Sequence, residues 1–414
     1  MKYAEEEVLQ YCEEEDVKFI RLAFCDVLGK QKNISIMPEE LPRAFRDGIA
    51  FDASAIAGFG DEARSDLFLH PEPDSLVPLP WRPEHGRVVQ MFSTITYPDG
   101  SPFACDCRSL LKKAIEAAKK EELSFTFGAE QEFYLFLQDE QGKPTRQPCD
   151  EAGYMDIAPE DRGENVRREI CLTLEKMGIY PESSHHEEGP GQNEIDFRYA
   201  DPLLAADQAQ TFQRVVKTVA DRNGFYASFA PKPLPDYPGN GFHINMSLKP
   251  FKEEKLYHMM AGVLTHVRAM TLCLNPLPES YLRLGKRKAP GYISWSAQNR
   301  SQLVRLPAAE GQYRRMELRS PDPAANPYLA FTLLIYAGLD GIKRGLPLPA
   351  PADFNLYTAD PSLLAGYEKL PGSYKEACEA ALQSDFMHTY IPEEILSIYL
   401  AGIPMDNIRE KGSE

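Results

Sequence analysis

The segment Ser183–Phe197, SSHHEEGPGQNEIDF, places two histidines and four carboxylates around a glycine–proline turn. The chain already carries a net charge of −17, so this further acid is unfavourable unless water or a cation compensates it. Its arms predict a hairpin that brings Glu187 and Glu194 together, while the adjacent His185 and His186 would point to opposite faces in structural or supporting roles. The segment is therefore either a solvated loop or part of a cation site.

Two more acids alternate along FTFGAEQEFYLF, which its aromatic and apolar residues predict to be a strand. Alternation sends Glu130 and Glu132 to the same face of that strand. An isolated pair of this kind most often lies on a solvated edge strand, but the apolar neighbours indicate burial. Two carboxylates on one buried face raise each other's pKa unless a cation lies between them.

Two later segments add polar groups to predicted strands. PGNGFHINMSL places His243 and Asn245 on one face, although a lone strand histidine is more often packed than ligating. RRMELRSPDP aligns Arg315, Glu317 and Arg319, a pattern that also fits an exposed ladder of ion pairs. Each motif is weak when taken alone.

Composition narrows the class of protein. With 414 residues, 43% of them hydrophobic and 26% charged, the chain has room for about two or three domains. No apolar stretch approaches the roughly 18 residues of a membrane span, and the longest, Tyr328–Leu339, suits a buried helix. The acidic balance argues against nucleic acid as a partner. Eight scattered cysteines and an acidic N-terminus predict a cytosolic protein with reduced thiols.

Local patterns change character near residues 99–106, so we predict one domain over 1–102 and a second over 103–414. In the first domain, residues 17–36 predict a hairpin with Gly29 in its turn. In the second, strands alternate with helices, which the sequence predicts at 107–123, 163–178, 201–224, 256–274 and 327–342. The long irregular stretch from 275 to 293 is typical of a lid or a binding loop.

Taken in order, the motifs strongly resemble one family. The segments FDASAIAGF, GAEQEF, HHEEGPGQNEI, KPLPDYPGNGFHINMSL, NRSQLVRLP and RRMELRSPDPAANPYLAF are similar to those of the glutamine synthetase family, over roughly residues 15–380. The resemblance implies an α+β fold. A small β-grasp-like N-terminal domain would precede a catalytic domain whose antiparallel strands form an active-site funnel flanked by helices.

The resemblance also implies two divalent cations, Mg²⁺ or Mn²⁺, in each active site. Hard oxygen ligands with one imidazole suit these ions better than zinc. Their positive charge, with arginines, would balance the clustered carboxylates and the phosphates of ATP. Matched motif to motif, one ion would bind Glu132, Glu187 and Glu194, and the other would bind Glu130, His243 and Glu317.

The reaction implied is ATP-dependent amide formation. The γ-carboxylate of L-glutamate would attack the γ-phosphorus of ATP, and ammonia would displace phosphate from the resulting acyl phosphate. By motif position, Arg300 and Arg305 would clamp phosphate, while Arg283, Arg319 and the Gly239 backbone would contact glutamate. The expected catalytic residues are Asp52, Arg300 and Arg319, and the expected nucleotide contacts also include Glu182, Asn245 and Ser247.

The residues expected to bind ammonium also imply that the protein is an oligomer. Asp52 matches an aspartate that holds ammonium in this family, and Tyr154 matches a tyrosine of the same pocket. Family members are rings with active sites between neighbouring subunits, so Asp52 would act on the adjacent chain. The resemblance implies a homo-oligomer, either a hexameric ring or a double-ring dodecamer.

Several positions depart from the family pattern. The flap segment RLGKRKAPGY is one residue shorter than usual and has Lys288 before Ala289–Pro290, where a glutamate normally closes over the ammonium pocket. A lysine there would repel ammonium, or else the flap is shifted and Lys288 points outward. Pro238 and Ala55 replace a usual asparagine and serine. The usual C-terminal helix pattern is missing, which favours a single ring.

Three functions fit these observations. The first is a glutamate–ammonia ligase. The second is a γ-glutamyl ligase that uses an organic amine, because only the acceptor pocket differs from the family pattern. The third is a non-catalytic relative that binds nucleotide, which is disfavoured because all six metal-ligand positions are filled. Sequence alone does not fix the direction of the Lys288 side chain, on which the first two depend.

Overall fold

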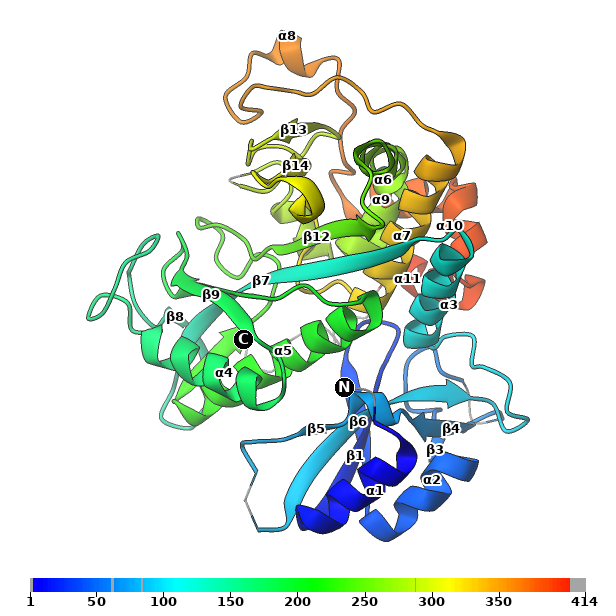
Figure 1. The fold of residues 1–414 in the computed structure, drawn as a ribbon. Coiled ribbons are helices and arrows are strands. Elements are labelled where there is room, and N and C mark those ends of the chain that lie inside the picture. The colour runs from blue at the N-terminus through cyan, green and yellow to red at the C-terminus, as the bar shows by residue number, and fades with distance from the viewer. Residues whose placement is uncertain (1–2, 61–62, 83–84, 287, 403–414) are drawn as a thin grey trace.

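The computed structural model describes residues 3–60, 63–82, 85–286 and 288–402. A small sheet domain formed by the N-terminal part of the chain packs beside a larger domain of sheet and helices (Figure 1). The expectation about the C-terminal segment falls partly on residues 403–414, which lie outside the described residues. Among the described helices, none combines the length and the apolar character needed to cross a membrane.

The N-terminal sheet is built on the predicted hairpin. Strands β1 and β2 pair antiparallel, and the turn between them is held by Asp26, whose carboxylate accepts from the backbone N–H groups of Leu28 and Lys30 at 3.0 and 2.8 Å. Gly29 has φ +81°, a conformation that glycine adopts without strain. The strand order is β2-β1-β6-β4-β3, with β1 and β6 parallel and β5 paired to β6. The elements are α1 Glu5–Glu14, β1 Val17–Cys25, β2 Gln31–Ile36, α2 Leu41–Asp47, β3 Ile49–Asp52, β4 Asp66–Pro71, β5 Val77–Pro78 and β6 Arg87–Thr96.

The larger domain contains a nine-stranded sheet whose main path runs in the order β13-β14-β15-β12-β7-β10-β9. Strand β7 also pairs with β8 and β11, so the strand that carries Glu130 and Glu132 is internal and the edge-strand interpretation is wrong. All its pairings are antiparallel except β13 with β14. The strands are β7 Ser124–Gln138, β8 Pro144–Pro148, β9 Pro181–His186, β10 Gln192–Phe197, β11 Phe225–Ser228, β12 Phe242–Lys249, β13 Trp295–Ala297, β14 Val304–Leu306 and β15 Met316–Leu318.

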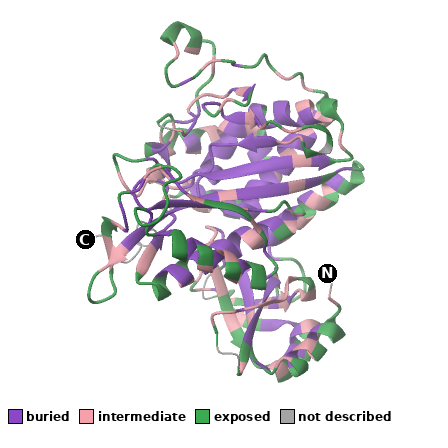
Figure 2. Ribbon diagram, turned by 60° about the vertical axis from the view of Figure 1, so that its left-hand side comes forward, coloured by how far each residue is buried: buried purple, intermediate pink, exposed green. Residues whose placement is uncertain are grey.

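Helices pack against this sheet and exclude water from it, so its strands are mostly buried (Figure 2). Helices α6 and α7 approach closely because glycines face each other. A Cβ on Gly262 would lie 2.0 Å from the Ala337 carbonyl oxygen, and one on Gly341 would lie 2.0 Å from that of His258. The predicted helices are present, as α3 Cys107–Lys120, α4 Glu164–Lys176, α5 Pro202–Arg222, α6 Glu253–Leu274 and α7 Pro327–Arg344, followed by α8 Pro361–Leu364, α9 Tyr374–Leu382, α10 Asp385–Tyr390 and α11 Glu393–Leu400.

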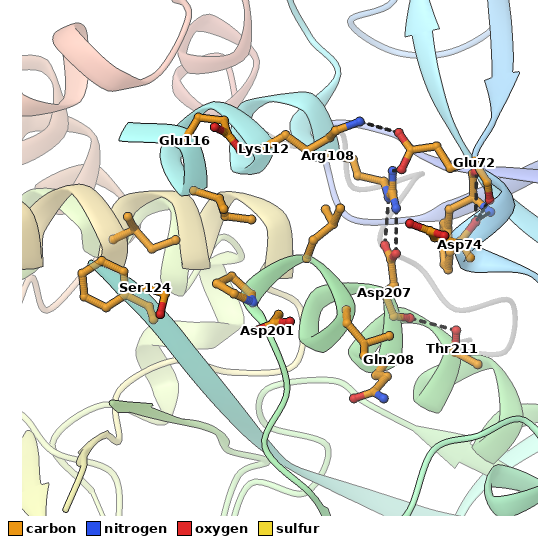
Figure 3. A pocket seen from close by; sticks show the side chains of 18 of the residues that line it. Glu72, Asp74, Arg108, Lys112, Glu116, Ser124, Asp201, Asp207, Gln208 and Thr211 are labelled. Atoms are coloured by element: carbon orange, nitrogen blue, oxygen red, sulfur yellow. Dashed lines mark hydrogen bonds and ion pairs between the residues drawn. The ribbon is translucent and has the colours of Figure 1, made fainter. Parts of the chain in front are cut away.

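A buried ion-pair network joins the two domains. Arg108 on α3 donates two hydrogen bonds of 2.9 Å to Asp207 on α5, and its remaining terminal nitrogen lies 2.6 Å from the carboxylate of Glu72, in the N-terminal domain (Figure 3). Tyr328 on α7 also donates to Asp207 at 2.7 Å. The network lines one side of a cavity of about 680 Å³. Three segments distant in sequence are therefore fixed relative to one another.

Replacing Asp207 with asparagine is expected to lower stability by about 3–5 kcal/mol, because Arg108 is only 4% exposed and would lose a charged partner. The measurement is the thermal unfolding midpoint. Glu116→Gln is the matched control, because Glu116 lines the same cavity but its ion pair is with the exposed Lys119. Equal midpoints for the two variants would show that the buried pair of Arg108 and Asp207 does not stabilise the fold.

Candidate active site

Cross-strand register places the predicted acids beside one another. Glu130 on β7 is opposite His243 on β12, and Glu132 is opposite Glu194 on β10. The Nδ1 atom of His243 lies 3.5 Å from a Glu130 oxygen and 3.9 Å from an oxygen of Glu317 on β15. The structure thus brings together Glu130, His243 and Glu317, the three residues expected to share one cation.

The predicted hairpin supplies a second acidic group. Glu187 follows β9 directly, and its backbone N–H donates to the Gln192 carbonyl at 2.8 Å to close the turn. The Nε2 atom of His185 lies 3.0 Å from Glu187 and 3.7 Å from Glu194. His185 therefore contacts the carboxylates themselves, whereas the sequence predicted a structural or supporting role for it.

Glu132 faces this second group from β7. One of its oxygens accepts from the Gly241 backbone N–H at 2.7 Å and from the Gln192 side chain at 3.1 Å. Glu132 and Glu187 line the same small cavity, together with His243 and Arg283. Glu132 thus lines one cavity with a residue of each acidic group, so the two groups belong to one site.

The electrostatics of the cluster favour a bound cation. Burial and the charge of Glu187 raise the pKa of Glu132 to about 7. Burial, with the charges of Glu132, Asp196 and Glu130, raises the pKa of Glu194 well above its usual value. Although burial opposes it, the hydrogen bond from His185 and the charge of Lys288 lower the pKa of Glu187 to about 2. Buried carboxylates that repel one another, with the imidazoles of His185 and His243 beside them, form a donor set dominated by oxygen that fits Mg²⁺ or Mn²⁺.

Arginines surround the acidic cluster on the side of β15. Glu317 is 1% exposed, accepts a hydrogen bond from Arg319, and lies 2.6 Å from the Nε atom of Arg305. The Nε atom of Arg319 is buried and has no hydrogen-bond partner in the described part of the chain. Such an orphaned donor costs free energy unless a ligand accepts from it. Arg300 is exposed beside Arg305, as expected for a residue that would meet a bound phosphate.

Arg283 and Gly239 line the same cavity as Glu132 and Glu187. Arg283 is 3% exposed and donates to the backbone carbonyls of Ser320 at 2.7 Å and Arg319 at 3.3 Å. A Cβ added to Gly239 would lie 2.3 Å from the Pro231 carbonyl oxygen and 3.0 Å from the Arg283 side chain. Glycine is therefore required for the backbone to lie this close to Arg283.

The predicted nucleotide contacts lie on two strands of the same sheet, β12 and β9, which are separated by β7 and β10. Asn245 donates to Glu130 at 2.7 Å and accepts from Arg315 at 3.1 Å. Ser247, two residues along β12, lies 2.6 Å from the Thr126 hydroxyl. Glu182 is an exposed residue of β9. Polar groups thus continue from the acidic cluster onto the adjoining surface.

The two residues expected to bind ammonium, Asp52 and Tyr154, lie in different parts of the structure. Asp52, exposed at the end of β3, accepts from the backbone and hydroxyl of Ser54 at 2.9 and 2.7 Å. Its hydrogen bonds among the described residues are thus within the N-terminal domain. Tyr154 lies at the acidic cluster, where its ring centroid is 5.4 Å from that of His185 in an edge-to-face arrangement.

The flap lysine points inward. The Nζ atom of Lys288 lies 3.0 Å from Glu188, 3.6 Å from Glu187 and 4.7 Å from the centroid of the Tyr154 ring. Although burial favours the neutral amine, the charges of these glutamates raise the pKa of Lys288. The alternative in which Lys288 points outward is wrong.

A buried support behind the hairpin was not predicted. His186 is 0% exposed, and its ring nitrogens contact the Glu187 carbonyl oxygen at 2.7 Å and the Asp150 carboxylate at 3.0 Å. Asp150 also accepts from the Gly191 backbone at 2.8 Å. The supporting role expected for His186 is confirmed, but Asp150 lies 36 residues upstream in a segment that lacks any motif.

Comparisons with known proteins agree over nearly the whole chain. The model of the glutamine synthetase catalytic domain matches residues 104–403, and that of the glutamine synthetase beta-grasp domain matches residues 16–98. Glutamine synthetases of Clostridium saccharobutylicum and Methanosarcina mazei are 42% and 43% identical to the chain; each alignment covers 97% of this chain and 94% and 93% of the relative. That of Staphylococcus aureus is 40% identical over 100% of this chain and 97% of its own length.

Solved structures show the same architecture. A GmaS/ADP complex superposes with a TM-score of 0.87 at 27% identity, covering 98% of this chain and 97% of that one. The Plasmodium falciparum glutamine synthetase superposes with a TM-score of 0.84 at 22% identity, covering 97% of this chain and 95% of that one. The predicted α+β fold, a β-grasp domain followed by a catalytic domain, is confirmed. With both family models matched and relatives above 40% identity over almost its full length, the chain belongs to the glutamine synthetase family.

Proposed function

We propose that this chain is an ATP-dependent glutamate–ammonia ligase, which forms L-glutamine, ADP and phosphate from L-glutamate, ammonia and ATP. The observation that carries the proposal is the meeting of two acidic groups with Arg283, Arg305 and Arg319, at the positions of the family motifs. Curated relatives that share about 40% of its residues over nearly the full chain are named glutamine synthetase.

The chemistry requires a leaving group on the γ-carboxylate of glutamate, because a carboxylate itself is a poor acyl donor. Phosphoryl transfer from ATP supplies that group as γ-glutamyl phosphate, and ammonia then displaces phosphate to form the amide. Negative charge spreads over the phosphoryl oxygens during the first step. Arg300 and Arg305 would stabilise it, and Arg319 has a free buried donor that suits a carboxylate or phosphoryl oxygen.

Glutamate would be held on the side of Arg283. Its guanidinium is fixed by two backbone carbonyls, so that it loses little conformational entropy when it binds a carboxylate. The adjoining Gly239 allows the main chain to contribute to the same pocket. Asn245, Ser247 and Glu182 would meet the nucleotide on the outer side of the sheet.

Family members generally use ATP with divalent metals, and this chain has acidic groups able to hold them. We assign one Mg²⁺ or Mn²⁺ to Glu130, His243 and Glu317, and a second to Glu132, Glu187 and Glu194, with His185 beside them. When bound, these ions would neutralise and orient the phosphates of ATP. Hydrogen bonds from Gly241, Gln192 and Asn245 keep the acidic side chains in position.

The acceptor site would be completed by a second subunit. Asp52 lies in the N-terminal domain and, with Tyr154 of an adjacent chain, would bind ammonium and help deprotonate it. This assigns a ring of subunits to the protein, as a single hexamer or two stacked hexamers. A domain boundary near residue 102 is supported by the family matches, which end at residue 98 and resume at residue 104.

Phosphate release from ATP, measured with glutamate, Mg²⁺ and a panel of acceptors, tests the assignment. We expect turnover with ammonium and little with methylamine or larger amines. Turnover with an organic amine alone would establish the γ-glutamyl ligase that uses organic amines, an alternative that the names of the relatives do not favour. No turnover with any acceptor would favour the third function, a non-catalytic relative that binds nucleotide.

A further inference from the structure

Lys288 forms a cationic contact inside the acidic cluster. Its ammonium group has three partners, namely the carboxylates of Glu187 and Glu188 and the face of the Tyr154 ring. The neighbouring Lys286, on the same loop, is exposed. The inward direction is therefore particular to Lys288 and does not follow from the general acidity of the surface.

The backbone of the loop sets this direction. Lys288 has φ +56°, in the left-handed region that non-glycine residues seldom adopt. The turn is closed by a 3.0 Å hydrogen bond from the Ala289 N–H to the Lys286 carbonyl, and Ala289 itself is 2% exposed. An unfavourable backbone conformation is thus maintained by a buried neighbour, and it places the lysine over the cluster.

The partners of Lys288 are chemical groups of the kinds that bind ammonium, and one of them, Tyr154, belongs to the proposed ammonium site. Carboxylates attract an ammonium group by charge, and an aromatic face attracts it through its quadrupole. The cavity lined by Glu132, Glu187, Lys288 and Ala289 has a volume of about 10 Å³, which is the space of about one water molecule. An ammonium ion in that space would lie against the positive lysine head and share its carboxylate partners, so the two cations would repel each other.

We propose that Lys288 is a specificity-determining residue that acts as a tethered competitor of the cationic acceptor, so that ammonium binds only when Lys288 withdraws from Glu187, Glu188 and Tyr154. This inference rests on the proposed ligase function and extends it to the control of acceptor binding. A small cation gains access when the lysine moves, whereas a bulkier amine must also displace the loop. The lysine thereby raises the ammonium concentration that the enzyme needs.

The test compares Lys288→Gln, which removes the charge at similar length, with Lys288→Arg, which keeps it, and with Lys286→Gln as the matched control on the same loop. Two quantities are measured: the KM for ammonium in steady-state turnover, and the Kd of Mn²⁺ alone, by calorimetry without nucleotide or glutamate. For Lys288→Gln we expect both to fall about fivefold, the size of a half-exposed ion-pair contribution. The KM for ATP should not change, and Lys288→Arg and Lys286→Gln should resemble the parent chain.

An unchanged Mn²⁺ affinity in Lys288→Gln, or a higher KM for ammonium, would overturn the proposal. Removal of a competing cation must strengthen the binding of the cations with which it competes. If the parent chain shows no ammonium-dependent turnover, the ligase function itself is contradicted. The calorimetric comparison then decides alone whether Lys288 competes with cations at Glu187. Failure of the inference and failure of the proposed function are thus separate outcomes.

Discussion

Replacement of Glu317 by glutamine is expected to lower kcat for ammonium-dependent phosphate release by about 100- to 1,000-fold, the range found when one charge-stabilising group is removed from a site. Glu317 is 1% exposed and contacts His243, Arg305 and Arg319 at once. The amide would supply one oxygen in place of a carboxylate. It would also leave two guanidinium groups without the counter-charge that holds them in position.

A measurement of metal affinity and a control variant test whether Glu317 acts by binding metal. The variant should bind Mn²⁺ more weakly in calorimetry, since it loses a charged oxygen donor of the group formed with Glu130 and His243. Glu310→Gln, an exposed carboxylate seven residues upstream, is the matched control and should retain both activity and metal affinity. Full kcat in Glu317→Gln, with normal folding by circular dichroism, would contradict the placement of the active site.

Asp52→Asn is expected to lower kcat/KM for ammonium by about 100-fold, because the variant lacks the charge proposed to hold ammonium and the base proposed to accept its proton. The KM for ATP should change little, as Asp52 lies in the N-terminal domain. Steady-state kinetics with varied ammonium measure this effect. Ser54→Ala is a useful companion, since it removes only the hydroxyl that donates to Asp52.

Mixed oligomers test whether Asp52 acts on a neighbouring subunit. When Asp52→Asn and Glu317→Gln chains are co-expressed with different tags and purified as hybrids, some sites combine an intact Glu317 with an intact Asp52 from the adjacent chain. Random mixing in a ring regenerates about a quarter of the sites. Recovery near this level is expected, whereas hybrids as inactive as either parent variant would show that Asp52 does not complete a neighbour's site.

Much of the site followed from local patterns. Strand alternation placed Glu130 and Glu132 on one face, and the glycine–proline turn predicted the hairpin that joins Glu187 to Glu194. Whether β7 was central or at an edge could not be derived in this way, because both positions allow the same alternation. The internal position of β7 is set by its pairing with strands more than 50 residues away in the sequence.

Other features depend on contacts that sequence does not encode locally. Asp150 supports His186 across 36 residues of chain, and Arg108 meets Asp207 across 99. The direction of Lys288 depends on a left-handed backbone conformation in a shortened loop, for which neither periodicity nor composition gives a signal. Helix α5 illustrates the same limit: it begins at Pro202 after Asp201, a residue type that often caps helices, but the Asp201 side chain makes no capping hydrogen bond.

The central claim is that ATP phosphorylates the γ-carboxylate of glutamate. The most direct measurement uses glutamate labelled with ¹⁸O in that carboxylate, incubated with the purified chain, ATP, Mg²⁺ and ammonium. Formation of the acyl phosphate followed by its displacement predicts that each phosphate released carries one oxygen from glutamate, and that glutamine retains the other. Release of phosphate without ¹⁸O would show that water, and not glutamate, attacks ATP, which would contradict the account.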